Sequence, residues 1–219
     1  MKLNQHKRQT ITLILYFLGV YGLRLTTQTL ILSPILDKFL FYGRHIIFFL
    51  ITICYFYRKE YSHLWKEFLS KFWKNIGQVF LSYIILLSVM LALAHLPLAR
   101  ESNSTTVLNH FNPKNIFEVL SHFVVVSIIG PMNEELVFRK ILIPTQQTKL
   151  KRYFTVFASS LLFGLIHIFK LKDLPSIVIY FSAGLVLSII YLIKKNIIFS
   201  SLAHILNNSL FTLINLKKL

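Results

Sequence analysis

Three groups of polar residues in the last third of the chain have side chains suited to acid, base and hydrogen-bond chemistry. They are Glu134 and Glu135 with Arg139, Phe163 with His167, and His204 with Asn208. Each group lies in an apolar stretch that is expected to sit in a membrane. Ionisable side chains are costly in hydrocarbon, so they are functional candidates by default. Together the three groups predict a buried catalytic site.

The first group contains two adjacent acids with different expected roles. Pro131 lacks a backbone donor and predicts a kink just before the pair. Glu134 and Glu135 should point about 100° apart on a helix. Glu135 is four residues before Arg139, the favoured order for an ion pair, which leaves Glu134 to face a cavity. In a purely structural alternative, Arg139 neutralises both acids and the cluster only holds helices together.

The two histidines are each open to a structural and a catalytic interpretation. A single histidine on a membrane helix is more often a helix–helix hydrogen-bonding group than a catalyst. His204 and Asn208, however, share one helix face. A chain turn near Leu150 would also bring His167 level with Glu134 on antiparallel helices. We therefore expect these four polar side chains to converge in one cavity within the membrane.

The elements that must position these residues are membrane helices. Hydrophobic residues make up 55% of the 219-residue chain, with 20 phenylalanines, and a membrane span needs about 20 mostly apolar residues. The sequence thus predicts an all-α, polytopic membrane helix bundle of about seven spans with a four-helix catalytic core. The expected spans are Thr10 to Leu32, Leu40 to Tyr57, Ile76 to Ala99, Ile116 to Ile129 continuing through the Glu pair, Phe154 to Phe169, Leu174 to Ile193, and Ile197 to Leu216.

The net charge of +16 fits basic residues gathered in loops beside a membrane. No basic face is expected outside the membrane segments, so nucleic acid is not an expected partner. The richest clusters, Arg58 to Lys74 and Lys149 to Arg152, fall on the same side as the N-terminus. The positive-inside rule then predicts a multi-pass protein of the cell membrane with a cytoplasmic N-terminus. Arg58 to Asn75 is also amphipathic, which predicts a helix lying in the membrane interface.

No linker or repeat divides the chain, so residues 1–219 are expected to form a single membrane domain. Within it, residues 1–115 would supply accessory N-terminal spans and the interfacial helix, and residues 116–219 the catalytic core. The lone Cys54 excludes an intramolecular disulfide and a thiolate metal cluster.

The motifs Pro-x-x-Glu-Glu-x-x-x-Arg, Phe-x-x-x-His and His-x-x-x-Asn, in this order on successive membrane helices, resemble the CPBP family. This family comprises type II CAAX prenyl proteases and bacteriocin-processing or immunity proteins, and is also called Abi. The resemblance covers about Phe117 to Leu213. The first hundred residues match only as additional spans. One departure is Lys140, where many members have glycine after the arginine.

The resemblance implies an intramembrane endopeptidase acting on a peptide or a lipid-anchored protein. Glu134 and His167 would activate a water molecule, and His204 and Asn208 would stabilise the oxyanion. Glu135, Arg139 and Phe163 would support the site. Glu134, His167 and His204 could instead hold a divalent metal such as zinc, with an open fourth position. Both a metal-dependent and a metal-free mechanism are compatible with these residues.

Composition narrows the expected role of such a protease. Lysine outnumbers arginine, and isoleucine, phenylalanine and asparagine abound, as is typical of an AT-rich bacterial genome. Bacteria hold few prenylated proteins, which favours bacteriocin or pheromone processing, or self-immunity, over CAAX trimming. A non-catalytic membrane immunity or scaffold protein that binds a partner through the polar core is the alternative. A proton-relaying transporter ranks third because no inverted repeat is evident.

Overall fold

The fold was analysed in a computed structural model that describes residues 4–25, 33–95, 115–144, 148–168 and 171–216. Every regular element in these ranges is a helix, so the predicted all-α membrane bundle is confirmed. The first half contains α1 (Gln5–Ile14), η1 (Leu15–Gly22), α3 (Pro34–Phe49), η2 (Leu50–Phe56), α4 (Arg58–Leu69) and α5 (Phe72–Ala94). The second half contains α7 (Ile116–Val124), η4 (Val125–Ile129), α8 (Gly130–Glu135), η5 (Leu136–Ile141), α9 (Lys149–Leu165), η6 (Leu171–Ser176), α10 (Ile177–Lys194) and α11 (Ile197–Leu216).

Five helices among the described residues are long and apolar enough to cross a membrane. They are Leu36–Phe56, Phe72–Ala94, Ile116–Ile141, Asp173–Lys194 and Ile197–Asn215. The predicted count of about seven is therefore not confirmed. The expected span Phe154 to Phe169 corresponds to α9, which has only 17 residues and begins with a basic turn. The expected span Thr10 to Leu32 falls partly on residues 26–32, which lie outside the described residues.

Local sequence signals explain where several helices begin. An Asn or Ser side chain just before the first turn accepts a hydrogen bond from a backbone N–H that has no partner inside the helix. The caps are Asn4 to the N–H of Lys7, Ser33 to Leu36, Asn115 to Glu118 and Asn196 to Ile198. At the C-terminal end of α10, Lys195 adopts a left-handed conformation with φ of 52°, which ends the helix.

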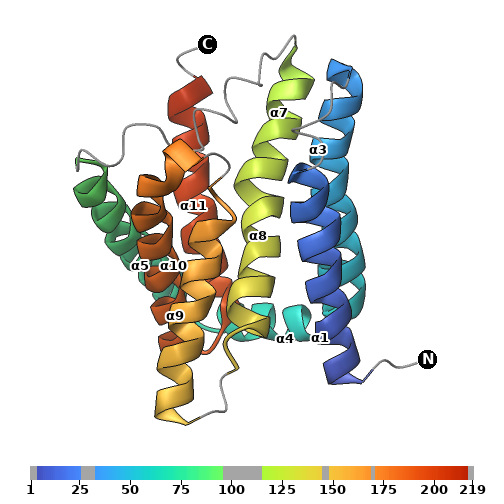
Figure 1. Cartoon of the computed structure of the whole chain (residues 1–219). Helices are drawn as coiled ribbons and strands as arrows, with labels where there is room; N and C mark the ends of the chain where they lie inside the picture. Colours follow the sequence, from blue (N-terminus) through green and yellow to red (C-terminus); the bar gives the residue numbers. More distant parts are fainter. Residues whose placement is uncertain (1–3, 26–32, 96–114, 145–147, 169–170, 217–219) are drawn as a thin grey trace.

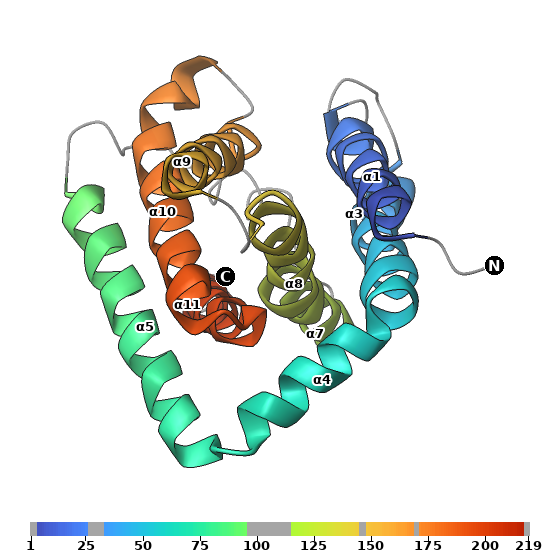
Figure 2. The same cartoon turned by 90° about the horizontal axis from the view of Figure 1, so that it is seen from below.

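The bundle is arranged around the continuous helix formed by α7, η4, α8 and η5. Figure 1 shows α1 and α3 on one side of this central helix and α9, α10 and α11 on the other. Seen from below, α5 lies beyond α10 and α11 at the edge of the bundle (Figure 2). The polar residues predicted to form the site are carried by the central helix, by the end of α9 and by α11.

The amphipathic segment predicted to lie in the membrane interface forms α4 and the start of α5. Helix α4 runs across the lower end of the bundle, between α3 and α5 (Figures 1 and 2). Its buried residues are Tyr61 and Phe68, and the ring of Phe68 meets that of Phe199 on α11 at 5.2 Å. The side-chain amide of Asn196 donates to the Leu64 carbonyl over 3.0 Å. These contacts fix α4 beneath the core.

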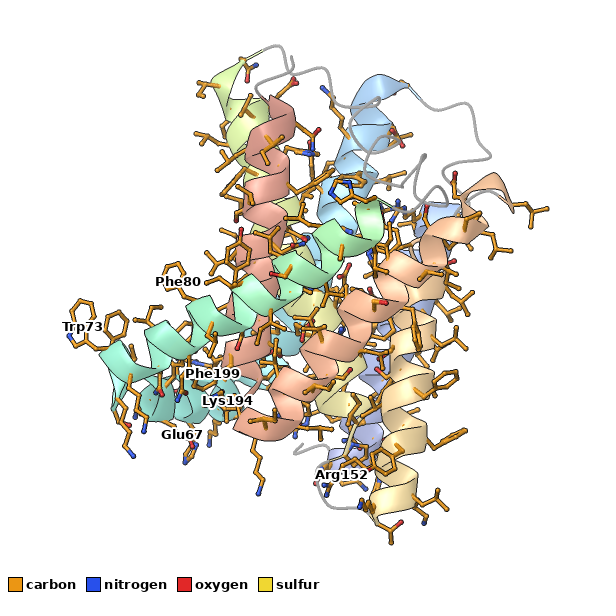
Figure 3. The ribbon with its side chains drawn as sticks, turned by 90° about the vertical axis from the view of Figure 1, so that its left-hand side faces the viewer. Glu67, Trp73, Phe80, Arg152, Lys194 and Phe199 are labelled. Atoms are coloured by element: carbon orange, nitrogen blue, oxygen red, sulfur yellow. The ribbon has the colours of Figure 1, made fainter. Side chains whose placement is uncertain are left out.

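Side chains seen from the α5 side separate an apolar flank from a charged end. Trp73 and Phe80 on α5 point away from the bundle, and Trp73 is 83% exposed (Figure 3). Glu67, Arg152 and Lys194 lie toward the lower end in the same view (Figure 3). The basic segments around α4, the start of α9 and the end of α10 therefore share one end of the bundle. This agrees with the expectation that the basic clusters lie on one side of the membrane.

An ion-pair network joins α4 to α1 and to the central helix. Glu60 pairs with Arg8 of α1, and its second oxygen lies 2.8 Å from the Lys140 ammonium. Arg8 also donates to the Phe56 carbonyl over 3.0 Å. Partial burial raises the pKa of Glu60, but the hydrogen bond and charge of Lys140 and the charge of Arg8 outweigh it, so its pKa lies below the ordinary value. Lys140, the departure noted in the sequence, thus has a structural role.

Candidate active site

The helix that carries the glutamate pair changes its hydrogen bonding on both sides of the pair. The segments Val125–Ile129 and Leu136–Ile141 are π-helical, and between them lies one short α-helical stretch. The Gly130 N–H bonds to the Val125 carbonyl, five residues back. Pro131 follows directly and offers no N–H, so the wider turn falls at the predicted site of a kink. Such π-segments occur frequently at functional sites.

Three successive residues of α8 point in three directions, as the helical rotation of about 100° per residue requires. Asn133 faces α3 and donates its amide to the His45 carbonyl over 3.0 Å. Glu134 keeps 15% of its side chain exposed. Glu135 is completely buried and faces Arg139. The expected division between an accessible and a paired glutamate matches this geometry.

Arg139 is a fully buried cation held by three kinds of contact. Its Nη1 lies 3.2 Å from Oε1 of Glu135, the ion pair expected from the four-residue spacing. Its Nη2 donates to the Gly184 carbonyl of α10 over 3.3 Å. The guanidinium also lies over the Phe163 ring, 4.5 Å from its centroid. Arg139 therefore joins the central helix to α9 and α10.

His204 lies between the two glutamates and contacts both. Its Nδ1 is 3.1 Å from Oε1 of Glu135, and its Nε2 is 3.7 Å from Oε2 of Glu134. A carboxylate accepts hydrogen bonds, so Nδ1 carries the proton in the contact with Glu135. That contact turns Nε2 toward Glu134. The sequence predicted that His204 would join the site, but not that Glu135 would orient it.

Phe163 is the centre around which the two histidines gather. Its ring centroid lies 4.7 Å from that of His167 and 5.8 Å from that of His204. On its other side, it packs edge-to-face against Phe138 at 5.5 Å. Phe163 thus contacts both imidazoles.

His167 lies just past the end of α9 and is held by two neighbours. Its Nδ1 is 2.7 Å from the Phe163 carbonyl, which only accepts, so Nδ1–H donates and Nε2 is left with its lone pair. Its ring stacks on Tyr180 of α10, with centroids 4.5 Å apart and planes at 16°. Sequence reasoning missed Tyr180 because it lies in a long apolar run with no motif of its own. Of the two predicted histidines, His204 is the one with a ring nitrogen within 4.0 Å of Glu134.

Asn208 lies one turn beyond His204 on the same face of α11. Its side-chain amide donates to the Val126 carbonyl in the first π-segment over 3.3 Å. One turn further along, Thr212 accepts a hydrogen bond from Ser127 over 3.0 Å. A polar stripe on α11 therefore packs along the central helix, and Asn208 is next to the histidine in that stripe.

Close helix packing brings the Phe163 end of α9 against α10. A Cβ on Gly164 would lie 3.1 Å from a side-chain carbon of Ile177, and one on Gly184 would lie 3.0 Å from the Cα of Ser160. Small residues allow membrane helices to approach this closely. The same approach places the Gly184 carbonyl within reach of Arg139.

Two further observations concern charge at the site. Arg24 of the first helical segment interacts electrostatically with Glu134. Sequence analysis does not assign this residue to the site. Among the described residues, no three His, Cys, Asp or Glu side chains are grouped as a metal site requires.

The three motif groups lie in a segment that matches a known protein family. Residues 116–210 match the model of the family described as "Type II CAAX prenyl endopeptidase Rce1-like". This segment of the chain is thus similar to the Rce1-like family, and the resemblance inferred from the three motifs is confirmed. All seven residues of the three motif groups lie in the matched segment.

One curated relative supports the same class. A protein of Bacillus subtilis (strain 168), named "Putative membrane peptidase YdiL", is 27% identical over 121 residues, which are 55% of this chain and 46% of the relative. The chain thus matches less than half the length of that relative. No solved structure matches the chain.

Proposed function

We propose that the protein is an intramembrane endopeptidase that uses Glu134 to activate water for attack on a peptide bond. The observation that carries the proposal is the placement of Glu134. Its carboxylate is the accessible member of the pair, and it faces a histidine whose other ring nitrogen is held by Glu135. A base, an oriented imidazole and a fixed counter-charge are the parts that hydrolysis needs.

Water would lie between Glu134 and His204. The 3.7 Å between Oε2 and Nε2 is too long for a direct hydrogen bond and suits a bridging water. Glu134 takes a proton from this water as its oxygen attacks the carbonyl carbon of the substrate. The carbonyl π electrons move to oxygen and form a tetrahedral oxyanion. Glu134 then gives the proton to the leaving nitrogen, the C–N bond breaks, and an acid and an amine are released.

The remaining polar groups have roles consistent with their hydrogen bonds. His167 presents an Nε2 lone pair and would share the work of activating water with Glu134. Asn208 has two amide hydrogens, one of which is engaged with Val126; the other would donate to the oxyanion beside His204. Glu135 and Arg139 would hold the site in shape, as Phe163 does by packing.

The proposed substrate is a peptide or a membrane-anchored protein, reached from within the bilayer. The similarity to the Rce1-like family and the peptidase relative support this class. Maturation of a bacteriocin or pheromone peptide, or self-immunity, fits the bacterial composition of the sequence better than trimming of prenylated proteins. Membrane lipids are the surrounding partners.

Glu134→Gln tests the proposal because it removes the base but keeps the shape of the side chain. We expect cleavage of the peptide substrate, or the dependent immunity phenotype, to fall by about 10²- to 10⁴-fold, with unchanged unfolding in detergent. Glu118→Gln, on the same helix but in an ion pair with Lys38, is the matched control and should stay active. A fully active Glu134→Gln protein would reject the catalytic role and favour a binding or scaffold protein.

We propose that the basic end of the bundle, with the N-terminus, faces the cytoplasm. A cysteine at the exposed Thr148, in a Cys54→Ser background, should resist a membrane-impermeant thiol reagent in intact cells and react after permeabilisation. Leu171→Cys in the same background is the control at the opposite end; Leu171 is 91% exposed and should react in intact cells. The reverse labelling pattern would invert the orientation.

A further inference from the structure

A crevice lies between η1 (Leu15–Gly22) and α3, apart from the candidate active site. Its volume is about 190 Å³, and its lining is apolar except for one charged side chain, Arg44. Two of the lining residues, Phe39 and Ile47, are 69% and 58% exposed. Both belong to a helix that is apolar enough to span a membrane. The crevice therefore opens sideways, toward the hydrocarbon of the bilayer.

Arg44 is a buried cation, and among the described residues no anion is in hydrogen-bond contact with it. Its side chain is 7% exposed, and its Nε and Nη2 have no hydrogen-bond partner. Arg24 repels the Arg44 charge, and Asp37 attracts it. Asp37 lies two helical turns earlier on α3, about 10 Å along the axis. An unpaired guanidinium at this depth is costly unless an anion joins it.

The guanidinium is directed toward the nearer membrane surface. It lies 4.8 Å from the ring centroid of Phe41, three residues nearer the start of α3. It is therefore about level with Phe41, roughly 7 Å along the axis from the start of the span at Leu36. A negatively charged lipid head drawn slightly inward can reach a cation at this depth.

The crevice is shaped to hold a chain. Gly19 and Gly43 line it from its two walls, and a Cβ added at either glycine would have no heavy atom within 4 Å. The other lining side chains, such as Val20 and Ile47, are hydrocarbon. An apolar chain can therefore lie between the two helices while Arg44 binds an acidic group attached to it.

Aromatic rings separate the crevice from the candidate active site. Phe48 lines the crevice and packs on Tyr16 at 5.4 Å. Tyr16 in turn packs on Phe138 at 5.7 Å, and Phe138 on Phe163 at 5.5 Å. These aromatic side chains thus lie between the crevice and Glu134. A ligand in the crevice is therefore more consistent with a membrane lipid than with the peptide that would be cut.

We propose that this crevice is a binding site for an anionic phospholipid, with the phosphate on Arg44 and an acyl chain along Gly19 and Gly43. A guanidinium and a phosphate can form paired, charge-assisted hydrogen bonds. The site is independent of the proposed peptidase activity.

Native mass spectrometry of the full chain in detergent tests the site, with 1-palmitoyl-2-oleoyl phosphatidylglycerol and the matching phosphatidylcholine as probes. The wild type should retain one phosphatidylglycerol about ten-fold more tightly than phosphatidylcholine. Arg44→Gln should remove this preference. Gly43→Leu should weaken retention of both lipids because its side chain would occupy part of the crevice.

Two control variants separate the site from general effects. Arg58→Gln removes one charge from the exposed face of α4, and Gly77→Leu adds the same side chain to another glycine with open surroundings; both should bind lipid like the wild type. Equal retention of the two lipids by the wild type, or unchanged retention in Arg44→Gln and Gly43→Leu, would overturn the proposal. Retention of a co-purified peptide that Gly43→Leu abolishes would assign the crevice to a different occupant and overturn it too.

Discussion

Two buried arginines on opposite sides of the central helix differ in how their charge is balanced. Arg139, toward α9 and α10, is fully buried and has Glu135, the Gly184 carbonyl and the Phe163 ring as neighbours. Arg44, on α3, is 7% exposed, and among the described residues no carboxylate lies within 4.0 Å of its guanidinium. In similar apolar surroundings, the first charge is balanced by the fold itself. The second is balanced only if something from outside binds, and this difference separates a structural cation from a ligand-binding one.

Neutralising the two arginines should therefore give opposite results. Arg139→Gln leaves the buried Glu135 carboxylate with no cation except the His204 contact and should lower the free energy of unfolding by about 3–5 kcal/mol. Arg44→Gln removes a charge that has no internal partner, so stability in lipid-free detergent should be unchanged or slightly higher. Denaturant unfolding of both variants in the same detergent measures the difference. A similar large loss for both would mean that Arg44 is paired within the fold.

The glycines near the two arginines also differ in how closely their surroundings are packed. Gly184 lies against the backbone of Ser160, whereas Gly43 borders open space. Gly184→Ala should cost about 1–3 kcal/mol because the neighbouring helix must move. Gly43→Ala should be neutral or stabilise by up to about 1 kcal/mol because alanine restricts the unfolded chain and fits the helix. Thermal unfolding of the pair is the measurement, and an equal effect of both would contradict the contrast in packing.

The side of the bundle with Arg139, whose charge is paired within the fold, is also the side that the sequence predicted in more detail. The Glu135–Arg139 pair and the shared face of His204 and Asn208 follow from spacing along a single helix. The contact of His204 with Glu135 depends on how two helices rotate against each other, which spacing within one helix does not determine. The stacking of Tyr180 on His167 likewise depends on how α9 and α10 pack against each other.

In the rest of the fold too, the sequence predicted features of single helices but not contacts between helices. Long apolar runs identified the helices of the bundle, and basic clusters marked one end of it. The predicted count of about seven spans was not confirmed, since five helices among the described residues qualify and α9 is short and begins with charged residues. Lys140 stood out in the sequence only as a departure from the motif. Its partner Glu60 is 80 residues earlier on α4, so its role could be found only once the helices were placed.

Glu60 connects the two sides, because its partners are Arg8 on the first helix and Lys140 on the central one. Its pKa is held below the ordinary value. A carboxylate with a lowered pKa stabilises the fold at pH values above its unfolded pKa, and that stability is lost as the pH falls through its folded pKa. The wild type should therefore lose stability below about pH 4.3, the ordinary pKa of glutamate.

Glu60→Gln should remove this part of the pH dependence and lower stability at neutral pH by about 0.5–1 kcal/mol, the size usual for a partly exposed pair. Unfolding in detergent between pH 3 and 7 would measure both effects. Glu67→Gln is the matched control on the same helix, because Glu67 contacts the Asn196 amide rather than a cation. It should leave the acid-sensitive component in place. If both variants keep the wild-type pH profile, the acid sensitivity arises elsewhere, and α4 is held beneath the bundle by Asn196 and the Phe68–Phe199 packing rather than by Glu60.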